Sequence, residues 1–246
     1  MSGIATNLVW RQFRRMCSKS REQHAKARFI SIKEKIISNT MISKNHLTPE
    51  ISLHLITSEC KLFHEPVCEG TERVFDNDPF WGFYWPGGQA LSRFILDTPS
   101  VVKSLRILDV GSGSGACSIA AKMSGAKIAV ANDIDYGAKV AADLNAELNN
   151  VIISTCTQNL IGNFCKDFDV ILVGDVFYDK DIADQILPWL TNLRKKGKEI
   201  YIGDPGRHGL STDAMNLMDK VLTYELPENC CIENNGFKIV NVWKVK

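Results

Sequence analysis

A chain of 246 residues is long enough for one α/β domain with an extension. Its composition, 45% hydrophobic and 23% charged, is typical of a globular protein and excludes disordered, collagen-like and disulfide-scaffold chains. Lys and Arg number 29 against 28 Asp and Glu, so the net charge of +1 predicts neither a nucleic acid nor a membrane partner. No stretch approaches the roughly 18 apolar residues that a membrane helix needs. We expect no membrane insertion and a monomer.

The cysteines and histidines do not form a metal-binding pattern. The eight cysteines include no Cys-x-x-Cys pair, and the five histidines do not lie at ligand spacing beside them. Several cysteines lie in apolar segments, where a reduced thiol packs as a small hydrophobic group. We therefore expect free thiols and no metal.

Charge is concentrated at the beginning of the chain. Residues 1–28 hold seven basic residues and one acid, Glu22, and place Trp10, Phe13 and Cys17 at helical spacing. This composition is typical of a mitochondrial transit peptide and predicts import into the mitochondrial matrix. The alternative is a solvated basic tail of a cytosolic protein.

An extension is expected between this segment and the main domain. Thr48 to Glu50 combine an N-cap residue with a proline in the first turn, and the apolar residues from Ile51 to Ile56 predict a helix. We expect residues 29–77 to form a helical extension or lid and residues 78–246 to form the main domain. Residues 78–89 contain five aromatic residues and three glycines, and their Pro and Gly content predicts a loop.

Strands and helices then alternate. The strand-like ranges are 105–110, 127–131, 151–155, 168–174 and 199–203, and the helical ranges are 114–124, 135–148 and about 181–195. This alternation predicts βαβ units in a parallel sheet with helices on both faces. Two final strand-like ranges, 222–226 and 237–245, have no convincing helix between them and predict an antiparallel pair at the sheet edge.

The strongest chemical signal lies between the first strand and the first helix, in the segment Leu108 to Ala116. Gly111, Gly113 and Gly115 allow a tight turn with a ligand against the backbone. The pattern also fits the dinucleotide fingerprint, so the glycines alone leave the cofactor open. Asp109 favours S-adenosylmethionine over NAD, because a carboxylate here repels a pyrophosphate and attracts the α-ammonium and sulfonium groups.

Polar residues after the next two strands complete the expected cofactor site. Asp133, 22 residues after Gly111, is expected to accept hydrogen bonds from the ribose hydroxyls. Asp135 is the competing acid, but it directly precedes a helical run and is expected to be the N-cap of that helix. Gln158 and Asn159 are predicted, on position alone, to read the adenine edge.

The fourth strand ends in a segment that suits an amine substrate. Ligands of parallel sheets gather at the carboxyl ends of the strands, so Asp175 and Tyr178 are expected beside the cofactor's methyl group as catalytic residues. A carboxylate with an aromatic neighbour binds an alkylammonium ion, and Tyr178, Phe177 and Trp81 are expected to contact the substrate. Asp175 is also expected to contact the cofactor.

Two alternatives remain at this edge. Asp175 could instead cap the following helix while Tyr178 packs in the core, although Asp179 or Asp181 could do the capping. The fifth strand ends in Gly203-Asp204-Pro205-Gly206-Arg207, a turn expected to shape the substrate entrance with Arg207 facing an acidic surface. The alternative is a simple turn with a solvated Arg207.

Five segments together resemble the seven-β-strand class of protein-lysine methyltransferases, and within it the family that modifies the electron transfer flavoprotein beta subunit in mitochondria. They are Trp85 to Gly88, Leu108 to Gly113, Ala131 to Asp135, Asp175-x-x-Tyr178 and Gly203 to Arg207. The resemblance is strong from about Asp78 to Arg207, and Ser114 stands where that family commonly has a bulkier residue.

The resemblance implies a Rossmann-like, seven-stranded, mostly parallel sheet with an antiparallel terminal strand and helices on both faces. It implies methyl transfer from S-adenosylmethionine to lysines of the flavoprotein subunit, to trimethyllysine, which weakens electron exchange with dehydrogenases. Trp85 is expected to contact the cofactor. The alternatives are a methyltransferase-like binding scaffold without turnover, and a methyltransferase for another mitochondrial protein or a small molecule.

Overall fold

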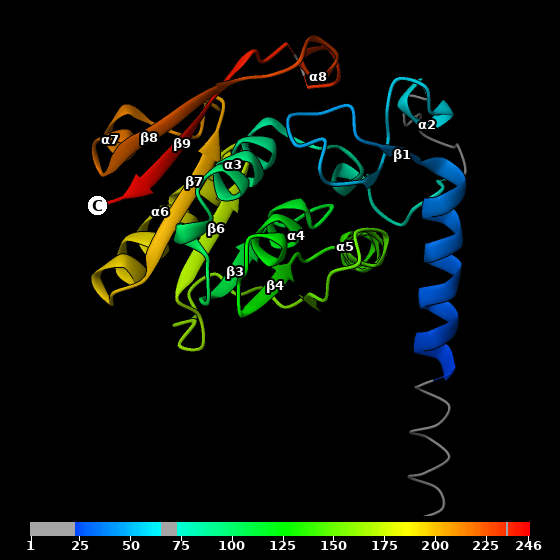
Figure 1. The fold of residues 1–246 in the computed structure, drawn as a ribbon, viewed down its shortest axis with the longest axis horizontal. Coiled ribbons are helices and arrows are strands. Elements are labelled where there is room, and N and C mark those ends of the chain that lie inside the picture. The colour runs from blue at the N-terminus through cyan, green and yellow to red at the C-terminus, as the bar shows by residue number, and fades with distance from the viewer. Residues whose placement is uncertain (1–22, 65–72, 235) are drawn as a thin grey trace, which may run out of the picture.

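The computed structural model describes residues 23–64, 73–234 and 236–246. A seven-stranded sheet of order β5-β4-β3-β6-β7-β9-β8 forms its centre (Figure 1). The strands are β3 (Arg106–Val110), β4 (Ile128–Asn132), β5 (Ser154–Cys156), β6 (Val170–Gly174), β7 (Glu199–Asp204), β8 (Met218–Glu225) and β9 (Ile239–Val245). Strands β3 to β7 pair in parallel, whereas β9 is antiparallel to both β7 and β8. The predicted sheet is confirmed.

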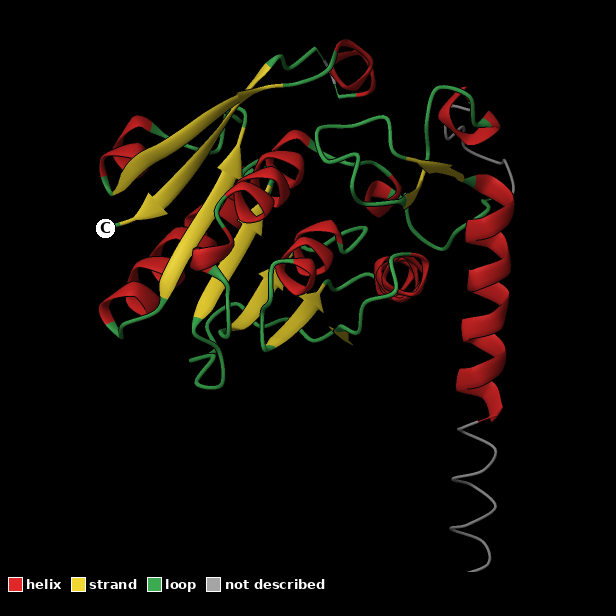
Figure 2. Ribbon diagram, in the orientation of Figure 1, coloured by secondary structure: helices red, strands yellow, loops and turns green. Residues whose placement is uncertain are grey.

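Helices cover both faces of this sheet (Figure 2). They are α3 (Pro86–Asp97), α4 (Ala116–Met123), α5 (Tyr136–Leu148), α6 (Lys180–Lys195), α7 (Thr212–Asn216) and α8 (Glu228–Glu233). Ile107 packs in one core with α3 and α4, and the next residue, Leu108, packs in a second core with α6. The central strands β3 and β6 are largely apolar because successive side chains point to opposite, equally buried faces.

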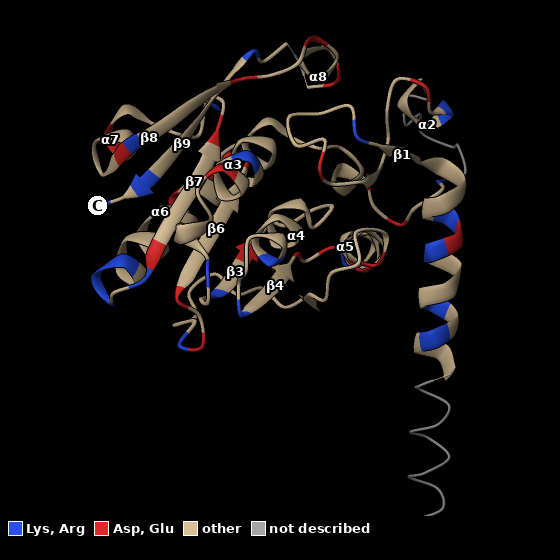
Figure 3. Ribbon diagram, viewed as in Figure 1, with Lys and Arg blue, Asp and Glu red and all other residues tan. Residues whose placement is uncertain are grey.

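Charged residues of the central strands lie mainly near the strand ends (Figure 3). β7, for example, begins at Glu199 and ends at Asp204. Asp109 lies one residue before the end of β3, and Asp175 follows directly after β6. The carboxyl edge of the parallel sheet therefore gathers several acidic side chains.

The extension differs from the prediction. Residues 23–39 form a helix, and β1 (Met41–Ser43) pairs antiparallel with β2 (Leu53–Leu55). The predicted helix from Thr48 is wrong, because its backbone amides donate to distant side chains instead of to helix carbonyls. The Ser52 amide donates to Asn149, which directly follows α5, and the His54 amide donates to Asn145 within α5, each at 2.8 Å. A short helix, α2 (Lys61–His64), follows. The helix over residues 23–39 crosses the boundary predicted at residue 28, and residues 1–22 lie outside the described residues.

Several further elements, α3 and α7 among them, were not predicted. The expected loop over residues 78–89 contains a short 3-10 helix, η1 (Phe80–Gly82), and the first residues of α3, in which Pro86 occupies the first turn where its missing N–H costs no hydrogen bond. The connection between the last two strands contains α8, which is too short for a helical periodicity to reveal.

Membrane-spanning helices and clusters of metal ligands are both absent from the described part of the chain. None of its helices is both long and apolar enough to cross a membrane. Within the same residues, no three His, Cys, Asp or Glu side chains lie together as metal ligands. The six cysteines that the structure describes are free thiols.

Candidate active site

The turn between β3 and α4 has the conformation that its glycines predict. Gly111, Gly113 and Gly115 have φ angles of 66°, 49° and 80°, values that residues with a side chain rarely adopt. A Cβ atom on Gly115 would lie 2.8 Å from the Cβ of Ala142 in α5. All three glycines therefore suit the backbone conformation, and Gly115 is also required for packing against α5.

Asp109 lies beneath this turn with 2% of its surface exposed. Its Oδ2 accepts hydrogen bonds from the Ser118 amide at 3.1 Å and the Ser118 hydroxyl at 3.0 Å. Burial raises the pKa of Asp109 to about 7, while the bonds from Ser118 oppose this shift. Asp109 also lines a hollow above the turn. A carboxyl group in this position can pair with an ammonium group in that hollow.

Asp133 ties the end of β4 to the glycine turn. Its Oδ2 accepts a hydrogen bond from the Gly113 amide and its Oδ1 accepts one from the Asp135 amide, both at 3.0 Å. Asp135 accepts a bond from the Gly137 amide at 2.6 Å and is the N-cap of α5, as predicted. Because a carboxylate has about four acceptor positions, Asp133 retains capacity for further donors.

The loop after β5 is held by a residue that the sequence reasoning did not single out. The Asn132 side-chain amide donates to the carbonyls of Cys156 at 3.0 Å and Gln158 at 2.9 Å. The side chain of Asn159 accepts a hydrogen bond from the Ile161 amide. Gln158 and Asn159 are both exposed, and their contact with adenine stays a prediction.

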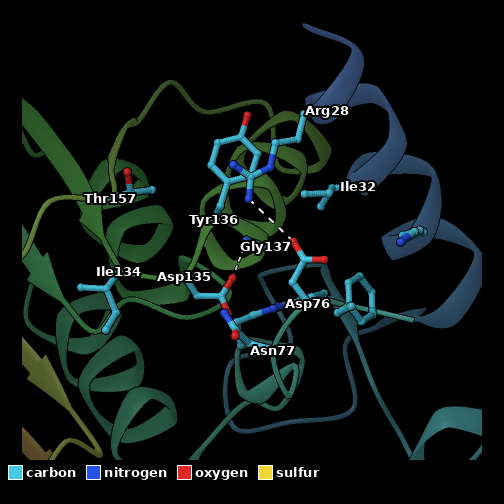
Figure 4. Close-up of a pocket in the computed structure, with 12 residues that line it drawn as sticks. Arg28, Ile32, Asp76, Asn77, Ile134, Asp135, Tyr136, Gly137 and Thr157 are labelled. Carbon is cyan, nitrogen blue, oxygen red and sulfur yellow. Dashed lines mark hydrogen bonds and ion pairs between the residues drawn. The ribbon is translucent and has the colours of Figure 1, made fainter. Parts of the chain in front are cut away.

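Two hollows lie on this side of the molecule. The first, about 40 Å³, is bounded by the glycine turn and by aromatic residues that include Phe83, Tyr84 and Trp85. The second, about 330 Å³, lies between the helix over residues 23–39 and the start of α5 (Figure 4). Ile134 and Thr157 line the second hollow. Since Asp133 bonds to Gly113 and directly precedes Ile134, it lies between the two.

The helix over residues 23–39 contributes a wall to the second hollow. The Arg28 guanidinium carbon lies 4.4 Å from the centre of the Tyr136 ring, and Arg28 pairs with Asp76 at 3.8 Å (Figure 4). The sequence reasoning missed this contact because it assigned Arg28 to a presequence. The basic composition around Arg28 gave no signal of a tertiary contact.

Asp175 connects three segments at the ends of β6 and β7. Its Oδ1 accepts a hydrogen bond from Arg207 Nε and pairs with Arg207 Nη2, each at 2.8 Å. Its Oδ2 accepts bonds from the backbone amides of Gly87 and, at 3.3 Å, Gly88. These four contacts occupy the usual acceptor positions of a carboxylate. Asp175 therefore caps α3, while Asp179 caps α6.

The environment of Asp175 is that of a buried, compensated carboxyl group. It is 7% exposed and has a φ angle of 55°, in the left-handed region. Burial raises the pKa of Asp175 to about 6, the Arg207 charge lowers it, and the Asp204 charge raises it. Strained, buried and pKa-shifted groups concentrate at functional sites.

Arg207 points into the protein, which corrects the expectation that it faces an acidic surface. Its side chain is 12% exposed, and its guanidinium carbon lies 5.3 Å from the centre of the Trp85 ring and 5.2 Å from that of Phe237. Asp204 Oδ1 accepts hydrogen bonds from the amides of Gly206 and Arg207. The turn after β7 is thereby shaped to direct Arg207 toward Asp175.

The N-terminus of α3 packs directly on the sheet edge without intervening side chains. A Cβ atom on Gly87 would lie 2.1 Å from the Gly203 carbonyl oxygen, and one on Gly174 would lie 3.1 Å from the Gly88 nitrogen. Three motifs recognised separately in the sequence, beginning at Trp85, Asp175 and Gly203, thus form one cluster. Their meeting is a property of the fold that spacing along the chain does not reveal.

The structure places the remaining predicted substrate residues in different surroundings. Tyr178 is 54% exposed at the carboxyl edge and is accessible to a substrate. Phe177 is fully buried and packs in the core with α6, which corrects its predicted substrate contact. Trp81 is 4% exposed and packs on Phe75 with ring centres 5.1 Å apart, so it is a wall residue of the second hollow. Tyr84, which the sequence reasoning did not single out, lines the first.

Comparison with known proteins identifies the family. Residues 89–196 match the family model of ribosomal protein L11 methyltransferase (PrmA). The electron transfer flavoprotein beta subunit lysine methyltransferase of Mus musculus is 44% identical over 204 residues, covering 82% of this chain and 78% of that protein. The chain belongs to the electron transfer flavoprotein beta subunit lysine methyltransferase family. The Homo sapiens member is 42% identical over 216 residues, covering 86% of this chain and 81% of that protein.

A solved structure has the same fold. A crystal structure of a protein assigned to the methyltransferases, in complex with SAH, superposes with a TM-score of 0.50 at 12% identity. The match covers 66% of this chain and 50% of that chain. The predicted family, fold class and enzyme class are confirmed.

Proposed function

We propose that this protein transfers methyl groups from S-adenosylmethionine to lysines of the electron transfer flavoprotein beta subunit, in the mitochondrial matrix. The observation that carries the proposal is the convergence, at one sheet edge, of the glycine turn with Asp109 and the segment from Asp175 to Tyr178. The names of the relatives support the substrate. Repeated transfer to trimethyllysine removes N–H donors but keeps the charge, which supports a weakened electron exchange with dehydrogenases.

The residues around the turn suit the chemistry of this cofactor. Asp109 offers a carboxylate for the α-ammonium group, and Asp133 offers acceptor positions for ribose hydroxyls. The hollow above the turn, about 40 Å³, is well below the roughly 300 Å³ of a small-molecule site. We propose that Phe83 rotates outward when the cofactor binds, while Trp85 stays in place, and that the adenine end of the cofactor lies toward Ile134 and Gln158.

The protein must deliver a neutral lysine nitrogen to the methyl carbon. The bound cofactor supplies an electrophilic methyl group on a positively charged sulfur. A lysine in water has a pKa near 10.4 and is almost entirely protonated at pH 7. Burial among aromatic side chains lowers that pKa, and the proton leaves to water. Tyr178 orients the amine, while Asp175, whose acceptor positions are filled by Arg207 and by the first turn of α3, acts by fixing α3.

A transfer assay tests this function. Purified protein is incubated with isotope-labelled S-adenosylmethionine and recombinant electron transfer flavoprotein, and the beta subunit is analysed by mass spectrometry. Labelled lysine is expected with the wild-type protein and is expected to fall at least tenfold with Asp109→Asn, which removes the charge beneath the turn. Cofactor binding without transfer to the flavoprotein would favour the scaffold alternative, and transfer to other proteins of a mitochondrial extract would favour a different substrate.

Cofactor affinity is expected to increase about tenfold from pH 5.5 to pH 7. Burial raises the pKa of Asp109 to about 7, so the carboxyl group is largely protonated at the lower pH and pairs weakly with the ammonium group. The free energy of unfolding changes in the opposite direction with pH. Because the pKa of Asp109 is raised in the folded protein, this residue contributes stability at low pH that is lost as the pH rises through about 7. Calorimetric titration with S-adenosylmethionine measures the affinity. The Asp109→Asn variant should show a much flatter pH dependence, and an equally steep one would assign the titration to another group.

A further inference from the structure

The proposed reaction raises an electrostatic problem at the carboxyl edge. A lysine must lose its proton before it can accept the methyl group, yet a nearby carboxylate stabilises the protonated amine and raises its pKa. Asp175 directly follows Gly174, which lines the hollow above the glycine turn. An uncompensated charge on Asp175 would therefore oppose deprotonation of an amine held at this edge.

Arg207 is held against Asp175 from several sides. The side chains of Arg207 and Asp175 are 12% and 6% exposed, and both Nε and Nη2 of the guanidinium lie 2.8 Å from Oδ1. Trp85 and Phe237 contribute the aromatic rings near the guanidinium. This two-point pairing uses the planar geometry of arginine, which lysine cannot reproduce.

Other ionisable groups also face Asp175, and one of them carries a further negative charge. Asp204, at the end of β7, raises the pKa of Asp175 by its charge. Its Oδ1 bonds to two amides of the turn, and its buried Oδ2 has no hydrogen-bond partner among the described residues. The thiol of Cys117 in α4 also interacts electrostatically with Asp175, and its own pKa is raised by burial. Because the raised pKa keeps this thiol neutral, the charge that Arg207 offsets is that of the two carboxyl groups.

We propose that Arg207 is a positioning residue that compensates the charge of Asp175 and thereby allows the substrate lysine to react as a neutral amine. This role rests on the proposed methyl transfer. Arg207 does not touch the reacting atoms; it acts through Asp175. Asp175 also holds the first turn of α3, and the Arg207 guanidinium lies over the Trp85 ring, so the pair fixes a wall of the cofactor hollow.

The pH dependence of methyl transfer separates this role from a purely structural one. In Arg207→Gln the amine is expected to keep its proton to higher pH, so the acidic limb of the pH–rate profile should move up by about 1–2 pH units. Transfer should then recover substantially at high pH. Arg207→Lys keeps the charge and should retain the wild-type position of the limb with a lower maximum. A loss by the same factor at every pH in Arg207→Gln would overturn the proposal.

Asp204→Asn tests the same charge balance with the opposite sign and serves if Arg207→Gln does not fold. Its Oδ1 can still accept the bonds from the Gly206 and Arg207 amides, so the turn is retained while one negative charge is removed. The acidic limb should move down by up to about 1 pH unit. An unchanged or raised limb would contradict charge compensation.

A measurement without substrate keeps this inference distinct from the proposed function. Carbon-13 NMR titration of aspartate carboxyl groups, with Asp175 assigned by substitution, should give a pKa near 6 in the wild-type protein and a higher value in Arg207→Gln. An equal value in the two proteins would overturn the pairing. If the wild-type protein transfers no methyl groups at any pH while this difference is observed, the proposed function fails and the electrostatic pairing stands.

Discussion

Replacing Asp175 with alanine is expected to abolish methyl transfer and to lower the free energy of unfolding by about 3–5 kcal/mol. The substitution leaves the Arg207 guanidinium buried without its counter-ion. It also leaves the Gly87 and Gly88 amides at the start of α3 without their acceptor. Burying an unpaired charge is among the most destabilising single changes in a protein. Urea unfolding and the transfer assay measure the two effects separately.

Asp179→Ala is the matched control, because Asp179 lies four residues later in the same segment and caps α6 through the Ile182 amide at 3.0 Å. It has no ion pair with Arg207, and loss of a helix cap costs about 1 kcal/mol. Transfer should be retained. If Asp175→Ala proved no less stable than Asp179→Ala, or kept its activity, the cluster around Asp175 would have neither of the roles assigned to it.

The sheet and the glycine turn were predictable because their signals are local. A parallel strand buried on both faces reads as a short apolar run, as in β3 and β6, and a turn with positive φ angles requires glycines at fixed positions. Asp135 was likewise identified as an N-cap from the helical run that follows it. Each of these features is decided within about ten residues of sequence.

The extension was mispredicted because distant residues decide its conformation. The cap and proline signals at Thr48 and Pro49 are genuine helix-start preferences. They are overridden because β2 pairs with β1 and because the Ser52 and His54 amides find acceptors 97 and 91 residues away. A preference worth about 1 kcal/mol does not prevail against several tertiary hydrogen bonds and a fully buried strand.

The same limit applies to the roles of the site residues. The sequence motifs predict that Asp175 and Arg207 belong to the site, but they also predict that both side chains face the substrate. A motif does not show which distant residues its side chains contact. Along the chain, Arg207 lies 32 residues from Asp175, and Gly87, whose amide also bonds to Asp175, lies 88 residues from it. Phe177 was misassigned because its neighbours Asp175 and Tyr178 face the edge while its own side chain enters the core.

Gly87→Ala is expected to lower the free energy of unfolding by about 3 kcal/mol or more and to abolish methyl transfer. The added Cβ atom would lie 2.1 Å from the Gly203 carbonyl oxygen and 2.6 Å from Asp175 Oδ2. The first of these is backbone and cannot rotate away, so α3 must move off the sheet edge. That movement would separate the Gly87 amide from Asp175 and displace Trp85 from the cofactor hollow.

Gly88→Ala, one residue further along α3, controls for the effect of alanine in the first turn of this helix. Its Cβ atom would meet only the Tyr84 ring, at the ordinary contact distance of 3.5 Å. Since alanine favours a helix over glycine by up to about 1 kcal/mol, this variant should be as stable as the wild-type protein or slightly more stable. Urea unfolding of the two variants compares them directly. Equal stabilities would mean that α3 does not pack on β7 as closely as the Gly87 contact requires. The proposal that α3 couples Trp85 to Asp175 would then be wrong.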